Sequence, residues 1–281
     1  MIYLTDKSYK SFTFSGGEQH VKLLGMPHYH GQDVTILKRI QSATDIMEVL
    51  QLNDIVRTRG AENVHLIMPY IPYARQDRAT TTNTSRALKV FADLLNSCNF
   101  KSVKVLDPHS MVAENLINNM QIIRPVENIL LEYMIIHKAI FDGVASDTVL
   151  ISPDVGALKK VESYAKYLGI KDVMAFHKVR DPATGDIKGI RLVAGEDINL
   201  LNRNVVVVDD LADGGRTFTE LLASYPDFGL TKSLHLFVTH GIFSKGLQPL
   251  FDAGFTHIGT TDSFIGPAHD DPRLDVVQVV Y

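Results

Sequence analysis

The sequence predicts an α/β protein built from mainly parallel sheets with helices on both faces, and three observations support this fold class. Short apolar runs alternate along the chain with amphipathic stretches, as expected when strands and helices follow one another. Several runs are almost entirely β-branched or aliphatic, which indicates strands buried on both faces. Most runs end in a polar cluster, and ligands of open α/β sheets gather at the carboxyl ends of the strands.

Five buried strands are the clearest elements. They are expected at residues 64–68, 103–106, 149–151, 205–208 and 234–238. Helices are expected at residues 85–96, 157–168 and 217–224. In the second of these, Leu158, Val161, Ala165 and Leu168 share one face, and Gly169 is placed to end the helix.

The order of strand, acidic turn and helix occurs three times, which favours two similar halves. It begins at residues 106–113 and returns at residues 151–157 and 208–217. No low-complexity linker separates the halves. We therefore expect two α/β domains.

Composition is that of an ordinary globular chain. The 281 residues are 45% hydrophobic and 21% charged, with a formal net charge of -4, so nothing indicates a basic nucleic-acid surface. The single cysteine, Cys98, continues an apolar helical stripe and is predicted to lie in the core. The N-terminus lacks the features of a signal peptide and no run reaches membrane-spanning length, so a cytoplasmic protein without membrane contact is expected.

The most informative segment is residues 204–217. A run of four valines leads to Asp209 and Asp210, and then to a Gly-rich turn before a predicted helix. Backbone N–H groups at the start of that helix would face a phosphate. Carboxylates beside such a turn can accept hydrogen bonds from ribose hydroxyls or hold a divalent cation. The segment therefore predicts a sugar-phosphate site.

This segment resembles the ribose-phosphate motif of the type I phosphoribosyltransferase fold. Further segments narrow the resemblance to ribose-phosphate pyrophosphokinases, also called phosphoribosyl pyrophosphate synthetases. They are residues 69–78, 106–110, 152–156 and 177–180, followed by Thr239, His240 and residues 260–263. Their order holds from about residue 20 to the end of the chain. The resemblance implies two phosphoribosyltransferase-like domains, residues 1–139 with the ATP-binding loops and residues 140–281 with the ribose-phosphate site.

The resemblance implies transfer of a diphosphoryl group from ATP to the anomeric hydroxyl of ribose 5-phosphate, with Mg²⁺ as cofactor and a dimer or hexamer as the assembly. It places His109 and Asp154 at the metal positions, and Lys178 and Arg180 at the catalytic positions of a hairpin closed by residues 181–186. The ATP-binding residues it implies are Arg75, Gln76, Asp77, His109, His30, Gly31 and Gln32. The ribose-phosphate residues it implies are Asp209, Asp210, Asp213, Gly214, Gly215, Arg216 and Thr217.

The chain departs from the family pattern in three places. Residues 28–32 lack the acidic acceptors for the adenine amino group, leaving Gln32 and one nitrogen of His30 as acceptors. Residues 79–84 are neutral where the family is basic, which bears on regulation by a second nucleotide or by phosphate. The phosphate turn has Gly214, Gly215 and Arg216, losing one hydroxyl donor and gaining a guanidinium.

These departures leave several functions open. The altered turn would tolerate a substituent on the 5-phosphate, which makes ADP-ribose an alternative acceptor. A non-catalytic nucleotide-binding paralogue would be expected to lose Lys178, Arg180, Asp209 or Asp210, and this chain retains all four. A phosphoribosyltransferase that consumes the activated sugar would explain Asp209 but not Arg75 and Gln76.

Overall fold

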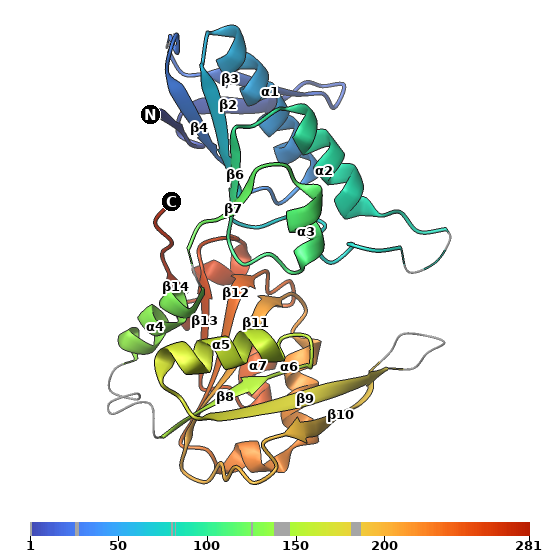
Figure 1. The fold of residues 1–281 in the computed structure, drawn as a ribbon, viewed down its shortest axis with the longest axis vertical. Helices are drawn as coiled ribbons and strands as arrows, with labels where there is room; N and C mark the ends of the chain where they lie inside the picture. Colours follow the sequence, from blue (N-terminus) through green and yellow to red (C-terminus); the bar gives the residue numbers. More distant parts are fainter. Residues whose placement is uncertain are drawn as a thin grey trace. The chain divides into compact units, whose positions relative to one another are not determined.

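The computed structural model describes residues 2–25, 28–79, 81, 83–124, 126–137, 147–180 and 187–281, and the side chains of residues 178–180, 187 and 188 lie outside the description. The chain forms two compact units, Met1–Arg124 with Tyr281, and Pro125–Val280. The boundary expected near residue 140 falls within residues 138–146, outside the described residues. Each unit has its own sheet and hydrophobic core (Figure 1).

The N-terminal unit contains a five-stranded parallel sheet in the order β1-β4-β5-β6-β7. Its strands are β1 (Ile2–Leu4), β4 (Asp33–Leu37), β5 (Asn63–Ile67), β6 (Ser102–Val105) and β7 (Met120–Ile122). A separate antiparallel hairpin joins β2 (Tyr9–Thr13) to β3 (Gln19–Leu23). The helices are α1 (Ala43–Thr58), α2 (Ala87–Ser97) and α3 (Met111–Leu116).

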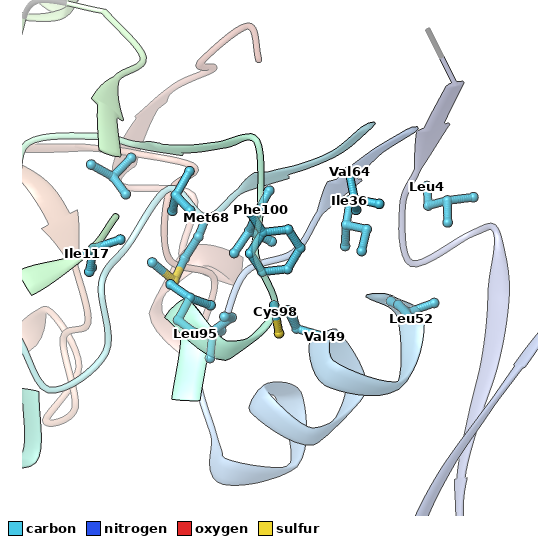
Figure 2. Packing of buried hydrophobic residues seen from close by; sticks show 14 of the residues in the cluster. Leu4, Ile36, Val49, Leu52, Val64, Met68, Leu95, Cys98, Phe100 and Ile117 are labelled. Carbon is cyan, nitrogen blue, oxygen red and sulfur yellow. The ribbon is translucent and has the colours of Figure 1, made fainter. Parts of the chain in front are cut away.

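Apolar side chains of this sheet pack against α1 and α2, and Figure 2 shows part of that core. Cys98 is buried among them, as its place on the apolar stripe of α2 predicted. Its thiol therefore has a packing role. Helix α1 starts at a capping box in which the Asp45 amide donates to Ser42 Oγ at 3.2 Å and the Ser42 amide donates to Asp45 Oδ2 at 2.8 Å.

The C-terminal unit contains a seven-stranded sheet in the order β10-β9-β8-β11-β12-β13-β14, with only the β9–β10 pair antiparallel. Its strands are β8 (Thr148–Ser152), β9 (Asp172–Arg180), β10 (Ile187–Ala194), β11 (Asn204–Ala212), β12 (Ser233–Gly241), β13 (His257–Thr261) and β14 (Leu274–Val277). The helices are α4 (Val126–Ile136), α5 (Leu158–Leu168), α6 (Arg216–Ser224) and α7 (Gln248–Ala253), with 3-10 turns at Pro226–Leu230 and Pro267–Asp270.

The valine run of β11 is buried on both sides because helices cover both faces of this sheet. Val205 and Val207 join the core that includes Phe218 of α6 and Leu250 of α7, and the alternating valines, equally buried, face the other side. Figure 1 shows α5 crossing that other side. Helix α5 ends at Gly169 with φ of 71°, the left-handed cap that the sequence predicted.

All five predicted strands and all three predicted helices are present, with ends shifted by one or two residues except at β11 and β12, which both run further at their carboxyl ends. None of the described helices is long and apolar enough to cross a membrane.

Candidate functional site

Strand β11 brings Asp209 and Asp210 to the carboxyl edge of the C-terminal sheet. The sequence predicted that the strand ends at Val208, but the ladder with β12 continues from Asp209 opposite Val238 to Ala212 opposite Gly241. Both acids are therefore half-buried strand residues rather than turn residues, and the Asp210 amide donates to Asp209 Oδ1 at 2.9 Å. The prediction failed there because acidic residues disfavour strands by propensity, whereas a long buried neighbour strand supplies the pairing.

The Gly-rich turn leads directly into α6. Gly215 is the N-cap residue with φ of 75°, and no side chain caps the helix, so the first amides of α6 are available to an anion. A Cβ on Gly215 would lie 3.1 Å from Cδ2 of Leu250. The positive φ favours glycine at this position, and a side chain would also crowd a methyl group of Leu250.

Arg216 begins α6 and its side chain turns along the helix. Its Nε donates to Glu220 Oε1 at 2.5 Å, and the arginine side chain is 61% exposed. This pairing holds the guanidinium on the helix surface, while the backbone amide of Arg216 belongs to the first turn.

The loop after β12 borders the turn. The amides of Ile242 and Phe243 donate to the Ala212 carbonyl at 2.8 and 3.1 Å, and the Ser244 amide donates to the Asp213 carbonyl at 3.1 Å. The loop carries Lys245, which sequence patterns did not single out.

Buried polar side chains support the same sheet edge from β12 and β13. Thr261 Oγ1 donates to the Thr239 carbonyl at 2.7 Å, and His240 Nδ1 lies 2.7 Å from Ser263 Oγ. Thr239, His240, Thr261 and Ser263 are all buried, so these residues stiffen the strand ends rather than face a ligand directly.

Asp154 follows β8, the strand next to β11. Its Oδ1 accepts from the Ala157 amide at 3.0 Å, and its carbonyl accepts from Ser152 Oγ at 2.8 Å. One carboxylate oxygen is thus engaged in holding the turn before α5. Because β8 and β11 are parallel neighbours, Asp154 lies at the same sheet edge as Asp209 and Asp210.

The predicted catalytic hairpin is present as the antiparallel pair β9 and β10. Lys178 pairs with Ile190 and Arg180 with Ile187 along the backbone. The side chains of Lys178 and Arg180, and residues 181–186 between the strands, lie outside the described residues. Strand β9 is the parallel neighbour of β8.

In the N-terminal unit, Arg75, Gln76 and Asp77 follow β5, and His109 follows β6, its parallel neighbour. Arg75, Gln76 and His109 are exposed. Before them in the loop, Tyr73 turns its ring toward Phe91, at a centroid distance of 5.9 Å, and packs on the core. The Tyr73 ring therefore anchors the loop that follows β5 on the core of the N-terminal unit.

His30, Gly31 and Gln32 lie at the opposite edge of that sheet, because they precede β4, whereas the predicted ATP-binding loop and His109 follow β5 and β6. They dock on the end of α1, where the Gly31 amide donates to the Gly60 carbonyl at 3.2 Å and the Tyr29 amide to the Arg59 carbonyl at 3.2 Å. Within one unit the structure therefore does not bring these three residues together with Arg75 and His109.

The predicted metal positions belong to different units, His109 to the N-terminal and Asp154 to the C-terminal one. Over the described ranges, no group of three or more His, Cys, Asp or Glu side chains is placed to hold a metal ion.

The fold, together with the polar residues at the carboxyl edge of the C-terminal sheet, defines a two-unit α/β protein of the phosphoribosyltransferase type. Residues 3–98 match the family model described as the N-terminal domain of ribose phosphate pyrophosphokinase. Over most of its length the chain is similar to ribose-phosphate pyrophosphokinases.

Its relatives align over most of their length. The chain is 27% identical over 234 residues to ribose-phosphate pyrophosphokinase of Haemophilus influenzae, covering 82% of this chain and 70% of the relative. It is 25% identical over 267 residues to the enzyme of that name from Thermococcus kodakarensis, covering 94% and 87%. The crystal structure of phosphoribosylpyrophosphate synthetase from Mycobacterium smegmatis has a similar fold, with a TM-score of 0.79, 23% identity and coverage of 96% and 85%.

Proposed function

We propose that the protein transfers the diphosphoryl group of ATP to the anomeric hydroxyl of ribose 5-phosphate, giving phosphoribosyl pyrophosphate and AMP. The match of residues 3–98 to the family model and the similarity to the named relatives support the reaction class. The observation that favours ribose 5-phosphate as the acceptor is the edge of the C-terminal sheet, where Asp209 and Asp210 lie beside a helix start with glycine at the N-cap.

The acceptor is bound through two groups, its phosphate and its ribose hydroxyls. Its phosphate meets the amides of residues 213–217 at the start of α6, where aligned backbone dipoles favour negative charge. The carboxylates of Asp209 and Asp210 accept hydrogen bonds from the ribose hydroxyls, which fixes the sugar relative to the phosphate. A substrate held at both ends presents its anomeric hydroxyl in a constant position, which lowers the entropic part of the barrier.

ATP is bound by residues from three loops and from the β9–β10 hairpin. Arg75 supplies a planar guanidinium suited to phosphate or to a purine face, and Gln76 and Asp77 supply polar contacts in the same loop. The resemblance to the family favours His109 and Asp154 as the residues that would hold Mg²⁺, and the metal would supply charge neutralisation for the triphosphate. Lys178 and Arg180 stabilise the charge that spreads over the transferring oxygens, which is the main task in phosphoryl-type transfer.

The position of His30, Gly31 and Gln32 supports an oligomer. These residues precede β4, at the sheet edge opposite the ATP-binding loop. A sheet of five-residue strands separates the two edges by roughly 17 Å. The adenine contacts expected from these three residues would therefore be made to ATP bound by a second copy of the chain, in a dimer or hexamer.

ADP-ribose is a second candidate acceptor, and one observation favours it. A Cβ on Gly214 would meet only the side chain of Lys245 within 4 Å, so among the described residues that side of the turn is bounded by one long, exposed side chain that can change rotamer. A substituent on the 5-phosphate would find space there.

Release of AMP tests the proposal. The protein is incubated with ATP and Mg²⁺, and with ribose 5-phosphate or ADP-ribose, and AMP and the new diphosphate ester are quantified by chromatography and ³¹P NMR. AMP formed only in the presence of acceptor supports the proposal. An absence of AMP with both acceptors would instead support a non-catalytic paralogue.

A further inference from the structure

We infer that Lys245 contacts the phosphate group on C5 of the acceptor and is a specificity-determining residue of the ribose-phosphate site. The inference rests on the proposed function and adds to it a cation that comes from outside the 209–217 segment. The side chain of Lys245 lies beside Gly214. Cε and Cδ lie 3.6 and 3.8 Å from the place that a Cβ on Gly214 would take. The aliphatic stem thus runs along the Gly-rich turn.

The backbone that carries Lys245 is fixed relative to that turn. Three amides, those of Ile242, Phe243 and Ser244, donate to the carbonyls of Ala212 and Asp213 at 2.8 to 3.1 Å. The Gly246 amide closes the loop by donating to the Phe243 carbonyl at 2.8 Å. Lys245 therefore keeps its place beside the turn without help from its own side chain.

The loop is also anchored by a buried ring. Phe243 is buried, and a Cβ on Gly241 would lie 2.2 Å from Cε2 of that ring. Glycine at position 241 is what lets the ring fold back under the strand end. An exposed lysine on a loop held so firmly presents a charge at a defined point, unlike a lysine on a freely moving loop.

The surroundings of the ammonium point to an anion. Lys245 is exposed and makes no ion pair or hydrogen bond with the part of the chain that the structure describes. The start of α6, two residues after Gly214, carries partial positive charge and has no side-chain cap among the described residues. A phosphate monoester or diester at this turn would be complementary both to the helix start and to the lysine ammonium.

Arg216 is less suited to this role, although it lies within the turn. Its Nε is engaged by Glu220 at 2.5 Å, four residues along the helix. Lys245 has no comparable acidic partner within the described residues. The phosphate is therefore met by backbone amides from one side and by the Lys245 ammonium from the other.

Steady-state kinetics of Lys245→Gln test the inference, with Lys232→Gln as a matched control. Lys232 is an exposed lysine just before β12, at the other end of the strand that leads to Lys245. We expect Lys245→Gln to raise KM for ribose 5-phosphate about tenfold or more, the range for a charge-assisted contact, while kcat and KM for ATP change less than about threefold. Lys245→Arg should recover part of the loss, and Lys232→Gln should match the wild type.

Binding without ATP separates this inference from the proposed function. Isothermal titration with ribose 5-phosphate, ADP-ribose and inorganic phosphate is carried out on the wild type and on Lys245→Gln, with circular dichroism to show that both are folded. If the wild type releases no AMP with any acceptor, the proposed reaction fails, yet weaker phosphate binding by the variant still supports the role of Lys245. Unchanged kinetics and unchanged binding in the variant, or no phosphate binding by the wild type, would overturn the inference.

Discussion

The ring of Tyr133 occupies the space that a side chain on Gly259 would need. A Cβ on Gly259 would lie 2.2 Å from Cε2 and 2.6 Å from Cδ2 of the tyrosine. Tyr133 is a fully buried residue of α4, and Gly259 is buried in β13. The tyrosine also contacts Phe237 of β12, at a ring-centroid distance of 5.0 Å. The absence of a side chain at one strand position therefore determines how closely α4 packs on the sheet.

Gly259→Ala should lower the free energy of unfolding by about 2–3 kcal/mol, because neither the strand nor the buried ring can yield without losing other contacts. Gly229→Ala is the control, since a Cβ there would meet nothing within 4 Å, and it should change stability by less than about 0.5 kcal/mol. Urea unfolding followed by circular dichroism measures both variants. Equal stability of the two would mean that α4 can move away from the sheet at little cost.

A second prediction concerns pH and the histidines beneath Tyr133. The Tyr133 hydroxyl lies 3.0 Å from His235 Nδ1, and His235 Nε2 lies 3.2 Å from Ser233 Oγ, which donates to Asn204 Oδ1 at 2.8 Å. This series of hydrogen bonds assigns His235 the neutral tautomer with its proton on Nε2. Burial, followed by the nearby His257 and His137, lowers the pKa of His235 to about 3. The stacked ring of His257 is 4.4 Å away.

Because the pKa of His235 is lower in the folded state, the unfolded chain binds more protons between about pH 6.5 and pH 3. The free energy of unfolding is therefore unaffected by titration of His235 above about pH 6.5. As the pH falls from there toward 3, it decreases by about 1.4 kcal/mol per pH unit from His235 alone. Unfolding curves of the wild type and of His235→Asn at several pH values measure the difference in slope. NMR gives an independent reading, since the His235 ring signals should not titrate between pH 7 and 4.5. A normal titration there would contradict the prediction.

Lys178→Ala should lower kcat by orders of magnitude and leave KM for ATP nearly unchanged. The reason is that a contact made in the transition state affects turnover rather than ground-state binding. Lys171→Ala is the control, because Lys171 is an exposed lysine just before the same strand, β9. Near-normal AMP release by Lys178→Ala would show that the β9–β10 hairpin is not the catalytic element.

His109→Ala should raise the Mg²⁺ concentration needed for half-maximal AMP release without altering the fold. His109 is exposed at the carboxyl end of β6, so its removal leaves no cavity in the core. His20→Ala, an exposed histidine of β3 in the same unit, should leave the Mg²⁺ dependence unchanged. Circular dichroism distinguishes the outcomes, because a loss of folded structure in His109→Ala would indicate a structural histidine instead.

The features that depend on local residue patterns could be predicted from the sequence. The valine run of β11 predicted a strand covered on both faces, and Gly169 predicted the end of α5, because burial periodicity and left-handed caps are local properties. The continuation of β11 through Asp209 and Asp210 could not be predicted in this way. It depends on pairing with β12, which lies more than twenty residues later in the chain.

Two features of the site depend on tertiary structure alone. The position of His30 and Gln32 at the edge opposite the predicted ATP-binding loop follows from the parallel pairing of β4 with β5, which a motif does not encode. The approach of Lys245 to Gly214 depends on how the loop after β12 hydrogen-bonds to Ala212 and Asp213. Neither spacing nor residue type in the 209–217 segment indicates that a lysine about thirty residues away lies beside it.

The last prediction distinguishes the two acceptors through Arg216. Ribose 5-phosphate should have the higher kcat/KM, because a substituted phosphate fits an uncapped helix start less closely than a free monoester does. Arg216→Ala should change kcat/KM for ribose 5-phosphate by less than about twofold, since the guanidinium is paired with Glu220 and its side chain is 61% exposed. Glu220→Gln removes that partner while keeping the shape of the side chain. If the guanidinium then reaches a second phosphate, kcat/KM for ADP-ribose should rise in Glu220→Gln. In Arg216→Ala it should fall about tenfold or more relative to the wild type. A wild type that prefers ADP-ribose, together with a selective loss of that activity in Arg216→Ala, would establish the extended acceptor in place of ribose 5-phosphate.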